Sequence, residues 1–222
     1  LPGTVQSAIA FTSIARGNVP AAVCAASASS LVGIALTPLL AGLVLGSTGA
    51  GVPLGEAVLK IGVQLLLPFA AGHALRPWIG EWVARRQRWL RVVDQGSILL
   101  VVYTAFGAAV LDGLWHVVPA SALAQLVLCC VVLLALVLVA TTWLARAFGF
   151  DVEDEITIVF CGSKKSMATG VPMAQIIFSG GAAGLAILPL MVFHQIQLMV
   201  CAVLARRYAE RAQPALAGPS RG

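Results

Sequence analysis

The sequence predicts an all-α polytopic membrane protein, and its composition and hydropathy pattern support that prediction. Of the 222 residues, 59% are hydrophobic and only 10% are charged, whereas about 25% of the residues in a soluble domain are charged. The apolar residues come in long blocks, and short basic or Gly/Pro-rich joints separate these blocks. So few charges cannot cover so much Leu, Val and Ala in water, and lipid therefore has to be the solvent.

Six apolar blocks are long enough to cross a bilayer, because a spanning helix needs roughly 20 mostly apolar residues. They are residues 19–45, 54–75, 97–114, 119–145, 156–179 and 183–205, and the fifth is interrupted internally. Residues 1–15 form a seventh segment, which is shorter and more polar. Since the chain begins inside this segment without a methionine, we expect it to be N-terminally incomplete. Residues 208–222 are expected to be a cytoplasmic tail, and disorder is predicted from Gln213 onward.

The basic residues support this order of segments. If successive segments alternate in direction, every arginine falls on one side of the membrane and Lys60 falls on the other. Because positive residues collect on the cytoplasmic side, we expect a multi-pass protein of the cell inner (plasma) membrane with a cytoplasmic C-terminus. Residues 81–94 then form a basic cytoplasmic joint with two interfacial tryptophans, or alternatively an amphipathic helix that binds anionic lipid heads.

Several other classes of protein are not expected. The net charge of +5 arises at the ends of apolar blocks rather than in one patch, so nucleic acid is not an expected partner. The five cysteines lie in apolar runs without metal-ligand spacing, so no metal site is predicted. An acidic run at residues 151–155 is interpreted as a solvated helix start, which the helix dipole favours. No spanning segment holds a carboxylate pair or a nucleophile with a nearby base, so an enzyme is not predicted.

Two segments share a pattern that is unusual inside lipid. Residues 3–10 and residues 162–169 each place a Gly, a hydroxyl residue, a polar centre and a Ser in the same order. Backbone that unwinds inside a bilayer must line a cavity or be buried in protein. Interrupted helices at matching positions in two halves are typical of the central site of a transporter. We therefore predict breaks at residues 3–7 and 162–166 that lie opposite each other near the middle of the membrane.

Lys164 and Lys165 lie deep inside the fifth block. A lysine at that depth costs about 2.5–3.5 kcal/mol on insertion scales, so a partner or a water-filled cavity is expected. The alternative is that the segment is a loop and that both lysines are solvated. The predicted substrate or ion crossing region consists of Thr4, Gln6, Ser7, Ser163, Lys164, Lys165 and Ser166, with Ser27, Ser29, Gln175 and His194 as further lining residues. For His194, a role as a hydrogen-bonded core residue is the interpretation that we favour over a ligand role.

Several stretches make the chain resemble a known family. The sequences LPGTVQS at residues 1–7, ARGNV at 15–19 and LTPL at 36–39 resemble the fourth and fifth helices of the bile acid:sodium symporter superfamily (solute carrier family 10). The sequence CGSKKS at residues 161–166 is similar to one branch of that family, which contains its seventh member and the bacterial relatives of that member. The resemblance runs over essentially the whole chain.

The resemblance implies an inverted-repeat transporter fold of ten helices, of which about the last seven are present and two are broken and cross. Residues 1–45 would be the fourth and fifth helices in a core domain, residues 53–115 the sixth and seventh in a panel domain, and residues 119–207 the eighth to tenth in the core domain again. Because one repeat would be incomplete, we expect this piece to be inactive by itself.

Four positions depart from the sodium site that the resemblance implies. Typical members supply a Glu and a Gln to sodium from the ninth helix, and those positions hold Phe160 and Lys164 here. A phenylalanine offers no oxygen, and an ammonium repels a nearby cation. In the fifth helix, Ala22 and Ala26 stand where hydroxyl ligands are typical. The family's sodium chemistry is therefore not expected to carry over intact, and no cofactor other than Na+ is suggested at all.

The predicted function is secondary-active transport of a small organic anion across the inner membrane. In this hypothesis Lys164 or Lys165 replaces the coupling cation or binds the negative charge of the substrate. The alternative is a non-transporting membrane regulator or sensor that has the same fold. The expected partners are the transported anion and the lipid bilayer.

Overall fold

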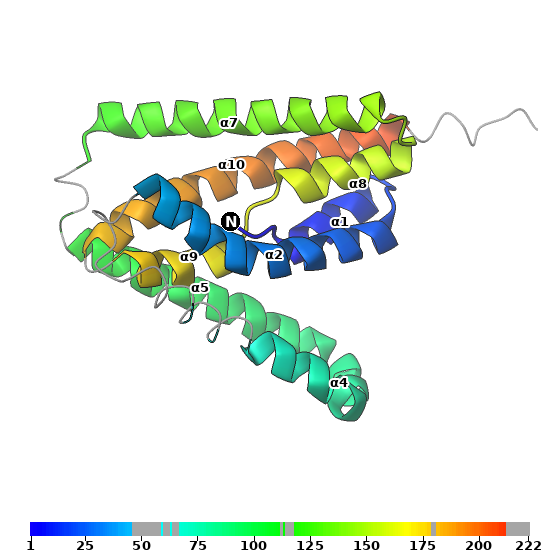
Figure 1. Ribbon diagram of the computed structural model, residues 1–222, viewed down its shortest axis with the longest axis horizontal. Coiled ribbons are helices and arrows are strands. Elements are labelled where there is room, and N and C mark those ends of the chain that lie inside the picture. Colours follow the sequence, from blue (N-terminus) through cyan, green and yellow to red (C-terminus); the bar gives the residue numbers. More distant parts are fainter. Residues whose placement is uncertain are drawn as a thin grey trace, which may run out of the picture. The chain divides into compact units, whose positions relative to one another are not determined.

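The computed structural model describes residues 1–45, 67–111, 118–178 and 181–211, together with the single residues 59, 63 and 113. The regular structure in these ranges is helical throughout, which confirms the predicted all-α class (Figure 1). The helices are α1 (Val5–Ile14), α2 (Val19–Leu45), α4 (Leu67–Arg85), α5 (Gln87–Leu111), α7 (Ala120–Ala147), α8 (Val152–Ser163), α9 (Met167–Ile177) and α10 (Gly181–Arg211).

The predicted apolar blocks become helices whose ends differ in places. Helix α2 has the predicted bounds, and α7 covers the predicted block 119–145 almost residue for residue. Within the described ranges, three helices are long and apolar enough to cross a membrane, namely Gln87–Ala108, Ala120–Ala147 and Gly184–Arg211. Half of the predicted block 54–75, Lys60 and the tail beyond residue 211 lie outside the described residues.

Residues 81–94, predicted to be a basic cytoplasmic joint or alternatively an amphipathic helix, are helical almost throughout. Helix α4 continues to Arg85 and α5 begins at Gln87, so only Arg86 interrupts the helical backbone in this stretch. The region is rich in Arg, Leu, Trp and Val, none of which prevents a helix. An exposed ion pair one turn apart, between Glu81 and Arg85 at 3.3 Å, adds a small local contribution.

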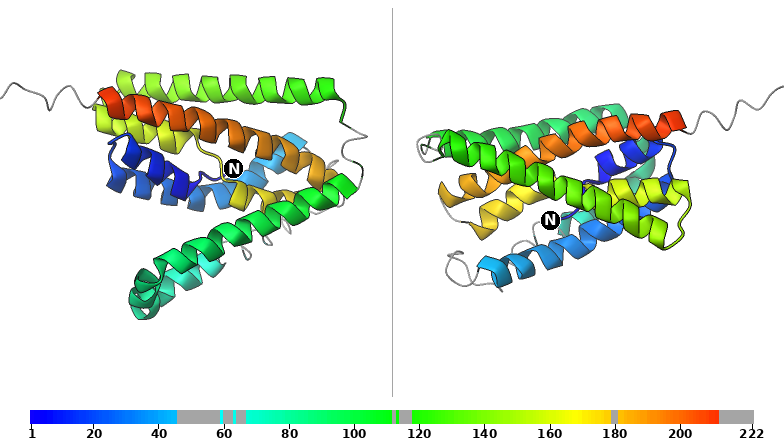
Figure 2. Two further views of the ribbon diagram at one scale, coloured as in Figure 1. Left: turned by 180° about the vertical axis from the view of Figure 1, so that it is seen from behind. Right: turned by 90° about the horizontal axis from the view of Figure 1, so that it is seen from above.

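The described chain divides into two compact units. The first contains Leu1, Leu31–Pro119 and Ala168–Leu190, and the second contains Pro2–Ser30, Ala120–Met167 and Met191–Gly222. In the first unit, α4 packs against α5, and Ile34, Met173 and Ile177 form a buried apolar cluster. In the second unit, α8 packs against both α1 and α7 (Figure 2). The division into core and panel domains by residue range stays a prediction.

An aromatic cluster forms the centre of the second unit. The Phe160 ring is fully buried, and it stacks on Phe11 with 6.0 Å between centroids. Tyr208 meets the same ring edge-on at 6.2 Å. Such offset and edge-to-face pairs add to the burial of apolar area. This cluster therefore ties α1, α8 and α10 together on one side of the interrupted segment.

The turn between α1 and α2 explains the ARGNV sequence. Helix α1 ends in a Schellman motif, in which Gly17 N donates to Thr12 O at 2.8 Å and Arg16 N donates to Ser13 O at 3.2 Å. A Cβ on Gly17 would lie 2.6 Å from Ile156 Cγ2, so the close approach of α8 requires glycine there. Asn18 caps α2 by accepting from Ala21 N at 3.0 Å.

Replacing Arg16 by Gly is expected to stabilise the protein. Arg16 has a φ of 61° and is the one non-glycine residue with positive φ in the described ranges. A side chain in this left-handed conformation costs roughly 1 kcal/mol, which glycine avoids at a helix end. We expect the free energy of unfolding of the detergent-solubilised protein to rise by about 0.5–1 kcal/mol, as measured by thermal unfolding. A loss of stability in the Arg16→Gly variant would instead assign the Arg16 side chain a stabilising contact of its own.

The acidic start of α8 is more than a solvated helix end. Asp151 caps the helix by accepting from Asp154 N at 2.9 Å, as the dipole argument predicted. Glu155 differs, because it is buried and accepts two bonds from Arg146, at 2.8 and 3.0 Å. It also accepts from Tyr208 Oη at 2.9 Å. The interpretation of all five acidic-run residues as solvated was therefore wrong for Glu155, which joins α8 to α7 and α10.

The stability of the protein is expected to fall in acid through Glu155. The hydrogen bonds from Arg146 hold the pKa of the Glu155 carboxyl below its ordinary value, although burial opposes them. A lowered folded-state pKa means that this stabilisation is complete above the ordinary pKa and is lost as the pH falls through the lowered one. We expect the free energy of unfolding of the Glu155→Gln variant to be about 1–3 kcal/mol lower than that of the unmodified protein at neutral pH. Its unfolding temperature should also depend less on pH between 3 and 6 than that of the unmodified protein.

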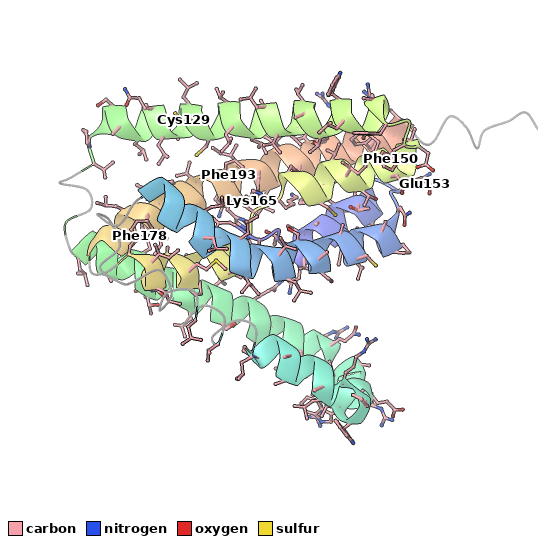
Figure 3. The ribbon with its side chains drawn as sticks, viewed as in Figure 1. Cys129, Phe150, Glu153, Lys165, Phe178 and Phe193 are labelled. Carbon is pink, nitrogen blue, oxygen red and sulfur yellow. The ribbon has the colours of Figure 1, made fainter. Side chains whose placement is uncertain are left out.

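Glu153 provides the matched control for this prediction. It lies in the same first turn of α8 and is exposed at its surface (Figure 3). Glu153→Gln removes the same charge, so its free energy of unfolding should stay within about 0.5 kcal/mol of that of the unmodified protein. Equal losses in the two variants would show that net charge, and not the buried contacts of Glu155, sets the acid sensitivity.

Candidate functional site

Two extended peptides meet inside the second unit. Residues 2–4 precede α1, and residues 164–166 separate α8 from α9. Ser166 N donates to Pro2 O at 2.8 Å, and Thr4 Oγ1 donates to Lys165 O at 2.8 Å. Each peptide thus supplies part of the hydrogen bonding that the other loses by being non-helical. The contact joins segments that are more than 160 residues apart, at the place where the two matching patterns occur.

The breaks are shorter than the sequence pattern predicts. Gly162 and Ser163 are still helical, so the second break covers residues 164–166 instead of 162–166. The first break lies at residues 1–4, and Gln6 and Ser7 already belong to α1. Glycine and serine lower helix propensity but do not prevent a helix whose neighbours are packed. Tertiary packing therefore decided where each helix stopped.

Gly3 lets the two peptides approach closely. Its N–H donates to Ser29 Oγ of α2 at 3.2 Å. A Cβ at this position would lie 3.3 Å from that hydroxyl oxygen and 3.7 Å from the carbonyl oxygen of Lys164. Such a Cβ would crowd the polar atoms that bond the chain here. Ser29, which was predicted as a lining residue, is thus brought to the site.

Gln197 holds the broken segment in place. Its side-chain amide accepts from Lys165 N at 2.9 Å and donates to Lys165 O at 2.9 Å. It therefore bonds both polar groups of one unwound residue, as a neighbouring strand would. His194 Nδ1 lies 3.2 Å from Lys165 O and 3.0 Å from Gln197 Nε2. His194 is thus a half-buried residue with hydrogen-bond partners, and Figure 3 labels Lys165 in the extended stretch.

Sequence reasoning did not place Gln197 in the site. One signal was present, since His194 and Gln197 stand three residues apart inside an apolar helix and so share a face. An uncharged glutamine in a membrane helix can find hydrogen-bond partners of many kinds, however. Only the fold shows that it pairs with the backbone of Lys165, 32 residues earlier.

Lys164 is the most unusual group of the site. Its side chain is 0% exposed, and its Nζ makes no hydrogen bond to a nitrogen or oxygen atom of the described residues, although it interacts with the side chain of Cys201. The Nζ lies 4.0 Å from the centroid of the Phe11 ring, which is a cation–π contact. Such a contact is worth about 2 kcal/mol when it is desolvated. Because Lys164 also ends α8, the negative end of that helix dipole favours its charge.

The other predicted site residues divide into two groups. Ser163 and Ser166 are buried beside Lys164, and Ser163 Oγ lies 3.9 Å from Cys201 Sγ. Ser7 is half-buried, and its hydroxyl has no hydrogen-bond partner among the described residues. The remaining three are Gln6, which is exposed on α1, Ser27, which is half-buried on α2, and Gln175, which is exposed on α9 in the first unit.

The fold and the site define a class of protein. An all-helical apolar chain with two paired interruptions and a buried ion is the architecture of a secondary membrane transporter. Residues 1–210 match the SBF-like CPA transporter family (DUF4137), and the chain belongs to this family. The family is one of membrane transporters, and the three long apolar helices among the described residues agree with a multi-pass membrane protein.

Named relatives agree with the family. The uncharacterized protein PA2026 of Pseudomonas aeruginosa is 66% identical over 217 residues, which cover 98% of this chain and 65% of that protein. The Escherichia coli protein named "Putative symporter YfeH" is 61% identical over 96% of this chain and 64% of its own length. Sodium/bile acid cotransporter 7 of Rattus norvegicus is 29% identical over 92% of this chain and 60% of its own length. This chain thus spans a little under two thirds of the length of these relatives.

Proposed function

We propose that the protein moves a small organic anion across the inner membrane and that Lys164 supplies the positive charge at its central site. The main support is the ammonium group of Lys164, which is fully buried and has no nitrogen or oxygen acceptor among the described residues. Burying an ammonium without such an acceptor is costly, so a protein that keeps one gains something else from it. A charge that a substrate anion can approach is a sufficient reason.

The surrounding groups suit an anion better than a cation. Helix α1 begins next to the broken segment, where Thr4 Oγ1 donates to Lys165 O, and the first N–H groups of a helix favour negative charge. The Ser7 hydroxyl, which has no partner among the described residues, can donate to a carboxylate or a phosphate, whereas Thr4 Oγ1 already donates to Lys165 O. We assign Thr4, Ser7, Ser163, Lys164 and Ser166 to the crossing region. Gln6, Ser27, Ser29, Gln175 and His194 remain proposed members of the site or its lining, and Lys165 is proposed to belong to it through its backbone.

Sodium does not fit the same residues well. Phe160 stands where typical relatives place a carboxylate, and it is fully buried between two other aromatic rings. Ala22 and Ala26 are buried as well and offer no side-chain oxygen. At a separation of 4 Å, a fixed ammonium repels a second unit cation by about 4 kcal/mol at an effective dielectric of 20. We therefore propose that Lys164 takes the place of a sodium ion.

The length of α8 supports a depth for the site in the membrane, and the positions of the arginines support the orientation of the chain. Helix α8 has 12 residues, which rise about 18 Å at 1.5 Å each and so reach roughly the middle of a bilayer. Arginines near the ends of α7 and α10 favour the cytoplasmic side for those ends. We propose a cytoplasmic C-terminus on this basis.

Uptake into liposomes tests this function. The full-length protein should take up at least one member of a panel of radiolabelled carboxylates, sulfonates and phosphate esters. The rate should be the same in sodium and in choline buffer, because no sodium ion is needed. Protein-free liposomes and a panel of organic cations serve as controls. Uptake that requires sodium would contradict the role of Lys164, and a folded protein that takes up no anion would favour the regulator or sensor.

A further inference from the structure

A groove runs between α7 and α10 in the second unit, away from the broken segments. The two helices pack directly through Cys130, Leu134 and Phe193. They run in the same direction (Figure 1), and beyond this contact they leave a groove of about 600 Å³ towards their C-terminal ends. Both helices belong to the long apolar set that can cross a membrane. The groove therefore faces a position where lipid is the available solvent.

The walls of the groove are apolar, and one end is basic. Apolar walls come from Leu138, Val139 and Trp143 of α7 and from Val200, Val203 and Leu204 of α10. Arg146 and Arg207 line the groove near the C-terminal end of each helix. Five of the six wall residues have another wall residue three or four positions away in the same helix, so each helix presents them on one face. The result is an elongated apolar surface that ends in two guanidinium groups.

The charges at the basic end do not cancel. Arg146 is paired with Glu155, whose second partner is the Tyr208 hydroxyl. Arg207 is exposed and makes no ion pair within the described ranges. Two arginines and one carboxylate therefore leave one positive charge on the rim of the groove. Arg206 and Arg211 add further positive charge outside the groove, and Glu210 adds one negative charge. The Arg211 guanidinium lies over the Tyr208 ring at 5.8 Å from its centroid.

We propose that this groove binds one anionic phospholipid. Its phosphate would lie against Arg207 and the outer edge of Arg146, and an acyl chain would cover the apolar walls towards Leu138. A soluble anion would leave those walls uncovered, and a zwitterionic lipid would bring no net charge to the rim. Arginine is suited to phosphate because its planar donors bind two oxygens at once. The inference is independent of the proposed transport mechanism, since it uses none of the residues of the crossing region.

Lipid binding to the purified full-length protein tests the proposal. Native mass spectrometry in detergent would compare dioleoylphosphatidylglycerol with dioleoylphosphatidylcholine, which has the same acyl chains. We expect one phosphatidylglycerol to bind at least fivefold more tightly. In Arg207→Gln this preference should fall about fivefold, because one basic residue near a lipid surface contributes about 1 kcal/mol. Arg206→Gln removes the same charge from the neighbouring residue, which does not line the groove, and should change little.

A second pair of variants tests the acyl chain. Val203→Trp fills the groove, whereas Val132→Trp adds the same bulk to an exposed position of α7 outside it. Only the first should weaken phosphatidylglycerol binding. Equal losses in Arg207→Gln and Arg206→Gln, or displacement of the lipid by millimolar inorganic phosphate, would overturn the proposal in favour of a diffuse or headgroup-only anion site. Binding that Val203→Trp does not weaken would overturn it too, because another part of the full-length protein would then cover the groove.

Discussion

Lys164→Met is expected to make the protein more stable and to abolish its transport. The substitution removes an ammonium that is fully buried and lacks a nitrogen or oxygen acceptor among the described residues. Insertion of a lysine at membrane depth costs about 2.5–3.5 kcal/mol, and the contact with Phe11 returns about 2 kcal/mol of that cost. Methionine has a similar length and packs well on an aromatic ring. We therefore expect a net gain of about 1 kcal/mol, or about 2–4 °C in the unfolding temperature.

Uptake should respond in the opposite direction. A hydrogen bond to a charged partner contributes about 1.5–3 kcal/mol, so its loss should reduce anion uptake at least tenfold. The measurement is the initial uptake rate in proteoliposomes, together with thermal unfolding of the same preparation. A variant that is inactive but more stable separates function from folding, because residues kept at a cost to stability are typical of functional sites.

Lys165→Met is the matched control for this result. Lys165 is the adjacent residue and carries the same charge, but its side chain is only half-buried. Its backbone, not its side chain, makes the contacts with Thr4 and Gln197. Uptake by this variant should stay within a factor of about two of the unmodified protein. If both lysine variants transported at the normal rate, the role of a buried ammonium in transport would have to be abandoned.

Gln197→Leu is expected to cause the second-largest effect, which is a loss of stability. Leucine keeps the volume of the fully buried side chain but bonds neither polar group of Lys165. The carbonyl of Lys165 still accepts from Thr4 Oγ1, so the N–H is the group left unpaired. Such a group costs about 1–3 kcal/mol. We expect the unfolding temperature to fall by about 2–12 °C, and uptake should fall as the broken segment loses its position.

Gln195→Leu distinguishes this cause from a general effect of hydrophobicity. Gln195 lies two residues earlier on α10 and is exposed, so leucine there should be neutral or slightly stabilising in detergent or lipid. Hydrogen exchange of the Lys165 amide adds a local measurement, since it should speed up in Gln197→Leu alone. Normal protection of that amide in Gln197→Leu would mean that the side chain does not hold the segment.

Much of the site could be predicted because its parts are unusual at the level of single residues. Two adjacent lysines inside an apolar block raise the free energy of membrane insertion whichever way their side chains point. The matched Gly and Ser patterns occur inside blocks whose other residues predict spanning helices. These signals depend on neighbours in the chain, so they are visible without a fold. Ser163, Lys164 and Ser166 are all buried, and their role in a crossing region stays a prediction.

Other features depended on residues far apart in the chain. The Lys165 backbone meets Thr4 and Gln197, and neither contact follows from local pattern. Glu155 could not be told from its acidic neighbours, although it alone is buried against Arg146 and Tyr208. The exact helix ends at Ser163 and Val5 were also set by packing, since Gly and Ser only weakly disfavour a helix.

The composition and the spacing of apolar blocks were sufficient for the class, because covering an apolar chain with so few charges is possible only in lipid. The costly residues inside those blocks were sufficient to locate a region of functional interest. The tertiary structure alone decided which polar groups satisfy one another and left the Lys164 ammonium against an aromatic ring. Burial and hydrogen bonding depend on which residues are neighbours in three dimensions. A sequence pattern identifies only the residues that need such neighbours.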